Sequence, residues 1–213
     1  MRVGGYILSC NCNIDIEYIW TKTTALFIYR TMAEASETKF SIGKDRFLVV
    51  SKWNGQKRIS LREYQSYEGG CKLYPTKKGV SLTVENWLDL KMIFDDVTTA
   101  LTDAIDGNKE VNFTHHIGGN VYVTISTQWP TVNIRKWWIP ENGDKVIPTR
   151  KGINLTSAEW DMIKKISKTL HIVVPELAYA LPCSMRGDHQ NQEGMLRCSH
   201  CNPNGCADWQ SVL

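Results

Sequence analysis

The chain has 213 residues, and its 25 Lys and Arg against 22 Asp and Glu give a formal net charge of only +3. This length suits one or two domains, and so small a net charge excludes no class of partner by itself. No run of about 20 apolar residues occurs, which excludes a membrane-spanning helix. The seven cysteines are odd in number, which favours a reducing compartment over a disulfide framework.

Residues 1–39 differ from the rest of the chain. Nothing in residues 1–31 matches the repeated sequence described below, and Met32 begins a stretch that is typical of a protein start. We therefore interpret residues 1–39 as an N-terminal extension that the protein can dispense with. The alternative is an ordered extra pair of strands, and the sequence leaves open whether residues 1–31 are present in the mature protein.

A basic cassette occurs twice. Lys77-Lys78-Gly79-Val80-Ser81-Leu82-Thr83 recurs as Arg150-Lys151-Gly152-Ile153-Asn154-Leu155-Thr156, at an offset of 152 − 79 = 73 residues. Between residues 62 and 87, eleven of 26 positions are identical at this offset. The duplication predicts two units, residues 40–106 and residues 113–176. Paired cations and aromatics in each copy indicate a repeated binding surface.

The first unit has the pattern of strands followed by a helix. We expect strands at residues 46–53 and 57–64, joined at Asn54-Gly55, the strongest short hairpin signal. A further strand is expected near residues 72–74. Thr83 is the expected N-cap of a helix, whose apolar seam is formed by Trp87, Leu90, Phe94, Val97 and Leu101 at steps of three and four residues.

The second unit repeats this order. Strands are expected at residues 121–127 and 131–138, and Thr156 to Glu159 form a capping box at the start of the second helix. Each unit is therefore predicted to be a four-stranded antiparallel sheet followed by one helix, which makes the fold class α+β with two tandem β-β-β-β-α units.

The predicted sheets are basic, whereas the predicted helices are not. Residues 40–78 contain nine Lys and Arg against three Asp and Glu, and residues 79–106 contain one against six. Single-stranded nucleic acid needs cations that follow its phosphates and flat side chains that stack on its bases. Because neighbouring strand residues face opposite ways, only one of Trp137 and Trp138 is expected at the surface.

Three segments of the first unit, in order, resemble the C-terminal domain of the transcriptional positive cofactor four family. They are Phe40-Ser41-Ile42-Gly43-Lys44, Arg62-Glu63-Tyr64 and Lys77-Lys78-Gly79-Val80-Ser81-Leu82, followed by Trp87. The second unit resembles this domain through Arg135-Lys136-Trp137-Trp138, the second cassette and Trp160. The resemblance implies dimerisation through the helices, binding of single-stranded DNA on the sheets, and nuclear coactivation of RNA polymerase II transcription. The nucleic-acid-binding residues that it implies are Trp53, Arg62, Lys77, Lys78, Arg135, Trp138, Arg150 and Lys151.

Several partners remain open at this stage. The two helices can pair within one chain as a pseudo-dimer or between two chains as a homodimer. Besides single-stranded DNA, melted or duplex DNA and the transcription machinery are candidate partners, and the sequence does not separate DNA from RNA. A different hypothesis is a protein-interaction adaptor that uses the helix seam. No catalytic set of side chains stands out, so we predict no enzymatic activity and no cofactor for the repeats.

The last segment, residues 177–213, is rich in cysteine. Cys183, Cys198, Cys201 and Cys206 include one Cys-x-x-Cys pair and can bind zinc tetrahedrally, and His189 or His200 can replace one of them. Such a zinc ion would be structural. The alternatives are a solvated tail with free thiols and a zinc-dependent nuclease activity that Cys198→Ala would abolish.

Overall fold

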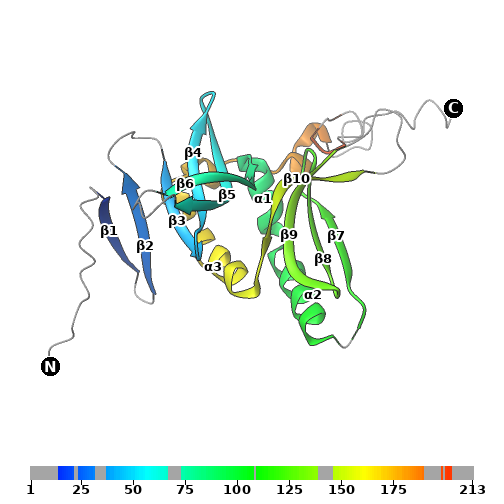
Figure 1. Ribbon diagram of the computed structural model, residues 1–213. Coiled ribbons are helices and arrows are strands. Elements are labelled where there is room, and N and C mark those ends of the chain that lie inside the picture. The colour runs from blue at the N-terminus through cyan, green and yellow to red at the C-terminus, as the bar shows by residue number, and fades with distance from the viewer. Residues whose placement is uncertain are drawn as a thin grey trace.

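The computed structural model of the protein describes residues 14–21, 24–31, 37–66, 73–107, 109–138, 146–189, 198 and 200–202. Two antiparallel sheets lie next to each other, with helices packed against them (Figure 1). Each repeat contributes four consecutive antiparallel strands and then a helix, which confirms the predicted α+β class and the β-β-β-β-α order.

The first sheet has six strands in chain order: β1 (Ile14–Thr21), β2 (Thr24–Thr31), β3 (Thr38–Gly43), β4 (Arg46–Trp53), β5 (Gln56–Ser66) and β6 (Leu73–Leu82). The predicted turn joins β4 to β5, and φ is 48° at Asn54 and 80° at Gly55. Asn and Gly tolerate this left-handed conformation best. β1 and β2 form a hairpin that pairs with β3 through Ile28 opposite Phe40, so part of residues 1–39 extends this sheet.

The second sheet has four strands: β7 (Asn112–His116), β8 (Val121–Ser126), β9 (Trp129–Trp138) and β10 (Ile147–Leu155), in the order β10-β9-β8-β7. Alternation of buried Val and Ile with half-buried polar residues along β8 gives one face to the core. The described part of this sheet has no counterpart of β1 and β2.

The helices are α1 (Val84–Met92), α2 (Phe94–Asp106) and α3 (Ser157–Ser167), and four short 3₁₀ turns follow: η1 (Leu170–Ile172), η2 (Pro175–Ala178), η3 (Cys183–Met185) and η4 (Gly187–His189). Thr83 and Thr156 cap α1 and α3, as predicted. Both form capping boxes, of which the sequence predicted the one at Thr156. The first seam is divided between α1 and α2, which meet at Ile93. The break has a packing reason: α1 lies on β5 and β6 of its own sheet, whereas α2 lies on β8 and β9 of the other (Figure 1).

The two units share one hydrophobic core. It contains the buried residues of the first seam and the apolar seam of the second unit, which is formed by Trp160, Ile163, Ile166 and Leu170. Trp87 and Trp160, equivalent in the repeat, are both fully buried. The ring of Phe94 makes edge-to-face contacts with both, at centroid distances of 6.3 Å and 5.0 Å. Trp160 Nε1 also donates to Thr98 Oγ1 at 3.0 Å. The helix seams therefore pair within the chain.

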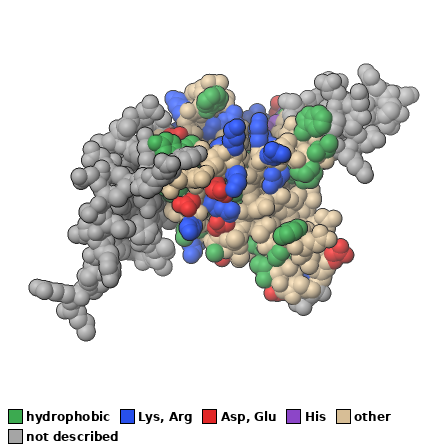
Figure 2. Space-filling model, viewed as in Figure 1, with side chains coloured by type: hydrophobic (Ala, Val, Ile, Leu, Met, Phe, Trp, Pro, Cys, Tyr) green, Lys and Arg blue, Asp and Glu red, His purple; other side chains and the backbone are tan. Residues whose placement is uncertain are grey.

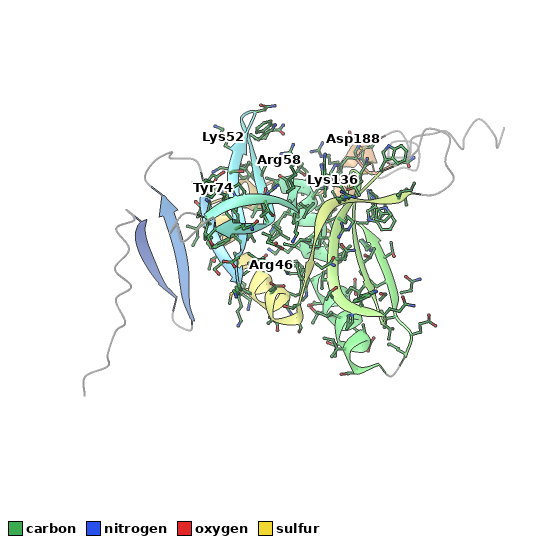
Figure 3. All side chains as sticks on the ribbon, viewed as in Figure 1. Arg46, Lys52, Arg58, Tyr74, Lys136 and Asp188 are labelled. Carbon is green, nitrogen blue, oxygen red and sulfur yellow. The ribbon has the colours of Figure 1, made fainter. Side chains whose placement is uncertain are left out.

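The first helix of each unit, α1 or α3, also contacts the first β-hairpin of the other unit. Asn86 of α1 donates from Nδ2 to the carbonyl oxygens of Ile117 and Gly118, at 2.7 Å and 2.9 Å. Its repeat counterpart in α3 is Glu159, which accepts from Arg46 Nη1 at 3.0 Å. Figure 3 shows Arg46 between the first sheet and α3. The two units are therefore docked on each other reciprocally within this chain.

Candidate nucleic-acid interface

The first cassette is held by a small hydrogen-bond network. Arg62 Nη1 donates to the carbonyl oxygen of Thr76 at 2.8 Å, and Thr76 Oγ1 donates to the carbonyl oxygen of Glu63 at 2.8 Å. The same hydroxyl accepts from the backbone N–H of Lys78 at 3.1 Å. The network fixes an irregularity in the β5–β6 pairing between Arg62 and Tyr64, which is a bulge.

The second cassette has the same network. Arg135 Nη1 donates to the carbonyl oxygen of Thr149 at 2.7 Å, and Thr149 Oγ1 donates to that of Lys136 at 2.6 Å. The backbone N–H of Lys151 donates to Thr149 Oγ1 at 3.2 Å. The repeated residues thus encode a repeated backbone shape, and both arginines help to hold it.

Gly79 and Gly152 allow the close approach of the strands at each bulge. A Cβ atom at Gly79 would lie 2.5 Å from the carbonyl oxygen of Leu61, and φ there is +153°. A Cβ atom at Gly152 would lie 2.7 Å from Arg135 Cγ. Since real Cβ atoms do not approach this closely, glycine at both positions is required by the shape.

The two cassettes meet at one cleft. β6 and β10 contact each other across the junction of the units, and the cleft there has a volume of about 670 Å³. Six of its nine lining residues are cations, and none is acidic: Arg62, Lys77, Lys78, Lys136, Arg150 and Lys151. Figure 2 shows Lys and Arg side chains gathered across the middle of this face. Five of the eight residues predicted to bind nucleic acid are therefore brought together.

The positive charge of the cleft is only partly balanced. Lys78 Nζ forms an ion pair with Glu63 at 2.9 Å. The repeat counterpart of Glu63 is Lys136, and burial together with the positive charges of Arg58 and Lys151 lowers the pKa of Lys136. Figure 3 shows Arg58 and Lys136 close to the junction. An anion in the cleft would relieve this repulsion.

The exposed tryptophans lie outside the cleft. Trp53, Trp129 and Trp138 are 66%, 76% and 56% exposed. Trp53 is opposite Gln56 at the end of its hairpin, and Trp129 is opposite Ser126 at the end of the equivalent hairpin. At the offset of 73, Trp129 corresponds to Gln56. The two hairpins therefore carry their terminal tryptophan on opposite strands.

The outer faces of the two sheets differ. On the second sheet a cavity of about 340 Å³ is lined by Trp129, Trp137 and mainly Thr and Asn residues, and the Trp137 ring is 5.5 Å from that of Tyr122. On the first sheet, Phe47, Val49 and Tyr64 form a small buried cluster instead, and burial raises the pKa of Tyr64 to about 12. Trp138, predicted as a stacking residue, is surface exposed, and Trp137 is half-buried.

Two residues of this surface are missing from the eight binding residues that the resemblance implies. Lys136 lines the cleft, and Trp129 is more exposed than Trp53 and Trp138. The repeat offset of 73 residues points to both positions, because Lys136 stands where the first unit has Glu63, and Trp129 stands where it has Gln56. Arg135, in contrast, does not line the cleft. It lies on the sheet face and contacts Asn133 Oδ1 at 3.2 Å.

The tail contains a separate cluster. Cys183, His189, Cys198 and Cys201 place their ligand atoms within 4.8 Å of one another, close enough to hold a metal. Three of the four predicted cysteines are thus brought together with one of the two alternative histidines. Cys206 lies outside the described residues.

These features define a tandem α+β protein with a basic cleft between two copies of one sheet-and-helix unit. The pattern of the Transcriptional Coactivator p15 (PC4) family matches the chain twice, over residues 40–93 and 115–166. The chain therefore carries the coactivator domain of this family in two copies, as the resemblance implied. This family is one of transcriptional coactivators and is not an enzyme family.

Curated proteins from three organisms are similar to part of the chain. The RNA polymerase II transcriptional coactivator KIWI of Arabidopsis thaliana is 40% identical over 63 residues, which are 30% of this chain and 57% of that protein. A putative RNA polymerase II transcriptional coactivator of Caenorhabditis elegans is 34% identical over 58 residues, 27% of this chain and 47% of that protein. An RNA polymerase II transcriptional coactivator of Drosophila melanogaster is 29% identical over 68 residues, 32% of this chain and 60% of that protein.

The chain thus spans about half the length of the curated relatives that it matches. No solved structure matches the chain significantly. Among the described residues, no helix is long and apolar enough to cross a membrane.

Proposed function

We propose that this chain is a nuclear transcriptional coactivator that acts with RNA polymerase II by binding single-stranded DNA. The phosphates of the strand occupy the basic cleft, and bases stack on the exposed tryptophans. The observation that carries the proposal is the convergence of six cations from both cassettes on one cleft without an acidic lining residue. Cations along the backbone combined with aromatic platforms are what single strands require.

The chain acts by binding in this proposal, and the repeats need no cofactor. A metal held by the tail cluster has a structural role. Melted promoter DNA and the transcription machinery are the partners that follow from coactivation. Imaging of the tagged full chain tests the nuclear location, and exclusion from the nucleus would contradict it.

The adaptor hypothesis has less support, because the helix seam is occupied. Trp87, Leu90 and Val97 are fully buried, and Leu101 is 3% exposed. A partner cannot reach these side chains without opening the core. The same burial supports an intrachain pseudo-dimer over a homodimer through the helices. We expect a monomer in sedimentation at low micromolar concentration, and a stable dimer of full-length chains would contradict this.

The test of DNA binding is a tryptophan-fluorescence titration of the full chain with a single strand of roughly 20 nucleotides, the matching duplex and the RNA strand of the same sequence. We expect the single strand to bind tighter than the duplex, with quenching from stacking. The log–log slope of affinity against salt is expected to be about −0.7 for each phosphate contact. Equal, weak binding of all three without quenching would refute the proposal, and preference for the RNA strand would favour an RNA-binding protein.

A matched control separates the effect of the cleft lysines on DNA affinity from the effect of the overall positive charge of the protein. Lys91 and Lys168 are exposed lysines outside the cleft. The variant Lys91→Gln/Lys168→Gln removes the same charge as a cassette double variant, but it should leave affinity within about 2-fold, because neither lysine lines the cleft and salt screens the attraction between exposed charges that are not in contact.

A further inference from the structure

The tail cluster is built from three short segments. Cys183 is in η3, His189 ends η4, and Cys198 and Cys201 flank a tight turn closed by Asn202 N–H to the carbonyl oxygen of Cys198 at 2.7 Å. The distances are 3.2 Å from Cys183 Sγ to His189 Nδ1, 3.5 Å from Cys183 Sγ to Cys198 Sγ, and 3.4 Å from Cys201 Sγ to His189 Nδ1.

These distances fit metal coordination. A disulfide would need about 2.05 Å between its sulfurs, whereas Cys183 Sγ and Cys198 Sγ are 3.5 Å apart. Tetrahedral zinc, with Zn–S bonds of about 2.3 Å, places its sulfur ligands about 3.8 Å apart. Three thiolates and one imidazole are also a donor set of structural zinc sites.

The same turn is docked on both repeat units. The carbonyl oxygen of His200 accepts from the backbone N–H of Gly119 at 2.6 Å, and the His200 ring lies so close to Gly118 that a Cβ atom there has no room. His200 Nε2 is 3.8 Å from Asp89 Oδ2 of α1. Arg186, between η3 and η4, pairs with Glu85 of α1 at 3.7 Å.

We propose that Cys183, His189, Cys198 and Cys201 bind one structural Zn²⁺, and that this zinc site is a clasp that fixes the tail across α1 of the first unit and the β7–β8 turn of the second. That turn, residues 117–120, also receives the amide of Asn86. The clasp therefore reinforces the docking of one unit on the other. The inference specifies the structural role of the metal proposed above and does not depend on DNA binding.

The short tail segment, residues 177–202, needs the stabilisation that a bound metal provides. Residues 177–202 contribute two apolar residues, Pro182 and Cys183, to the buried positions that the structure describes. So small an apolar contribution does not fix a chain segment by itself, whereas metal binding supplies folding free energy directly.

The first experiment measures zinc in the full-length protein after dialysis, by elemental mass spectrometry. We expect one zinc per wild-type chain, a loss to trace amounts in Cys198→Ser, and a clear decrease in His189→Ala. The matched controls are Cys206→Ser and His171→Ala, since His171 is an exposed histidine in η1. Both should keep one zinc. Loss in Cys206→Ser with retention in His189→Ala would overturn the ligand set, and a wild-type chain that takes up no Zn²⁺ would overturn the site.

The second experiment tests the clasp by hydrogen exchange of the full chain before and after zinc removal with a chelator. Faster exchange at the Gly119 amide, with the amides of the β4–β5 hairpin unchanged, supports it. Re-addition of Zn²⁺ should restore protection, which excludes simple misfolding of a variant. Unchanged exchange at Gly119 would overturn the clasp. Titration of the same zinc-free sample with single-stranded DNA keeps the two proposals distinguishable. Loss of DNA binding bears on the proposed function alone, whereas unchanged exchange at Gly119 bears on the clasp alone.

Discussion

The two repeat units share a backbone but not a surface. Both cassettes have the same arginine–threonine network, the same bulge and the same glycine. They differ in the charged side chains that this shared backbone carries. Glu63 in the first unit pairs with Lys78, whereas its counterpart Lys136 in the second unit lies among other cations. Duplication has therefore kept the shape that presents the cations and has left the second copy with more unbalanced charge.

A second contrast concerns the place where the units meet. Phe94 reaches both buried tryptophans, and its repeat counterpart is Ser167, which is 7% exposed. A large residue in one unit corresponds to a small one in the other. In a symmetric homodimer both positions would hold the same side chain. The asymmetry favours pairing of unlike units within one chain.

The largest effect is expected where the units meet. Phe94→Ala removes the partly buried ring that contacts both tryptophans, and we expect it to lower the free energy of unfolding by about 3 kcal/mol, the low end of the range for aromatic residues packed in a core. For a chain of this size, that corresponds to a fall in Tm of about 6–12 °C.

Thermal unfolding followed by circular dichroism measures the change. Met92→Ala is the control, because Met92 is 54% exposed beside the same helix break, and surface changes of this kind stay within about 0.5 kcal/mol. Equal Tm values for the two variants would mean that Phe94 does not join the units.

Much of this fold could be predicted from the sequence, because the signals for its turns and helix ends are local, and the repeat shows several of them twice. The turn at Asn54, the capping residues Thr83 and Thr156, and the seam through Trp87 are local features that a short window contains. The break at Ile93 was not predicted, because its cause is the second sheet, to which α2 turns. A periodic apolar seam indicates that one side of a helix is buried, but it does not indicate which sheet or helix that side packs against.

The candidate site was predictable in kind but less so in arrangement. The offset identifies Lys77, Lys78, Arg150 and Lys151 as one repeated feature, but no pattern within either unit predicts that both pairs face one cleft. That depends on contact between β6 and β10, more than 60 residues apart in sequence. Which of the exposed tryptophans contact DNA stays a prediction.

The hairpin tryptophans give the next test. Trp129 lines a cavity together with Trp137, whereas Trp53 lines none of the cavities described above. We expect Trp129→Ala to weaken single-strand binding by about 1–3 kcal/mol and Trp53→Ala to fall at the low end of this range. Titration by fluorescence anisotropy of a labelled strand measures both. If Trp53→Ala weakens binding more than Trp129→Ala, the first sheet is the principal stacking surface.

The two cassettes can then be compared directly. At 0.1 M salt, a slope of about −0.7 per contact corresponds to about 5-fold in affinity for each phosphate contact. Arg150→Gln/Lys151→Gln should therefore weaken binding about 25-fold. Lys77→Gln/Lys78→Gln should cost about 5-fold, because the ion pair with Glu63 already occupies Lys78.

Salt titrations check the origin of the loss. The slope should become shallower by about 1.4 for the second cassette and by about 0.7 for the first, with Lys91→Gln/Lys168→Gln as the control. Equal losses from the two cassettes would show that Glu63 does not withhold Lys78 from the strand.

The smallest effect is also the most specific, since it makes the first unit resemble the second. Glu63→Gln removes the carboxylate that pairs with Lys78 at 2.9 Å, and we expect binding to tighten by about 5-fold at 0.1 M salt, with a slope steeper by about 0.7. Stability should change little, because Lys78 is 73% exposed and exposed ion pairs contribute about 1 kcal/mol or less. Glu110→Gln, an exposed residue outside the cleft, makes the same charge change and should leave affinity unaltered. If Glu63→Gln behaves like Glu110→Gln, Lys78 makes no phosphate contact even when it is free, and the first cassette would then serve to shape the cleft while the cations of the second unit bind the strand.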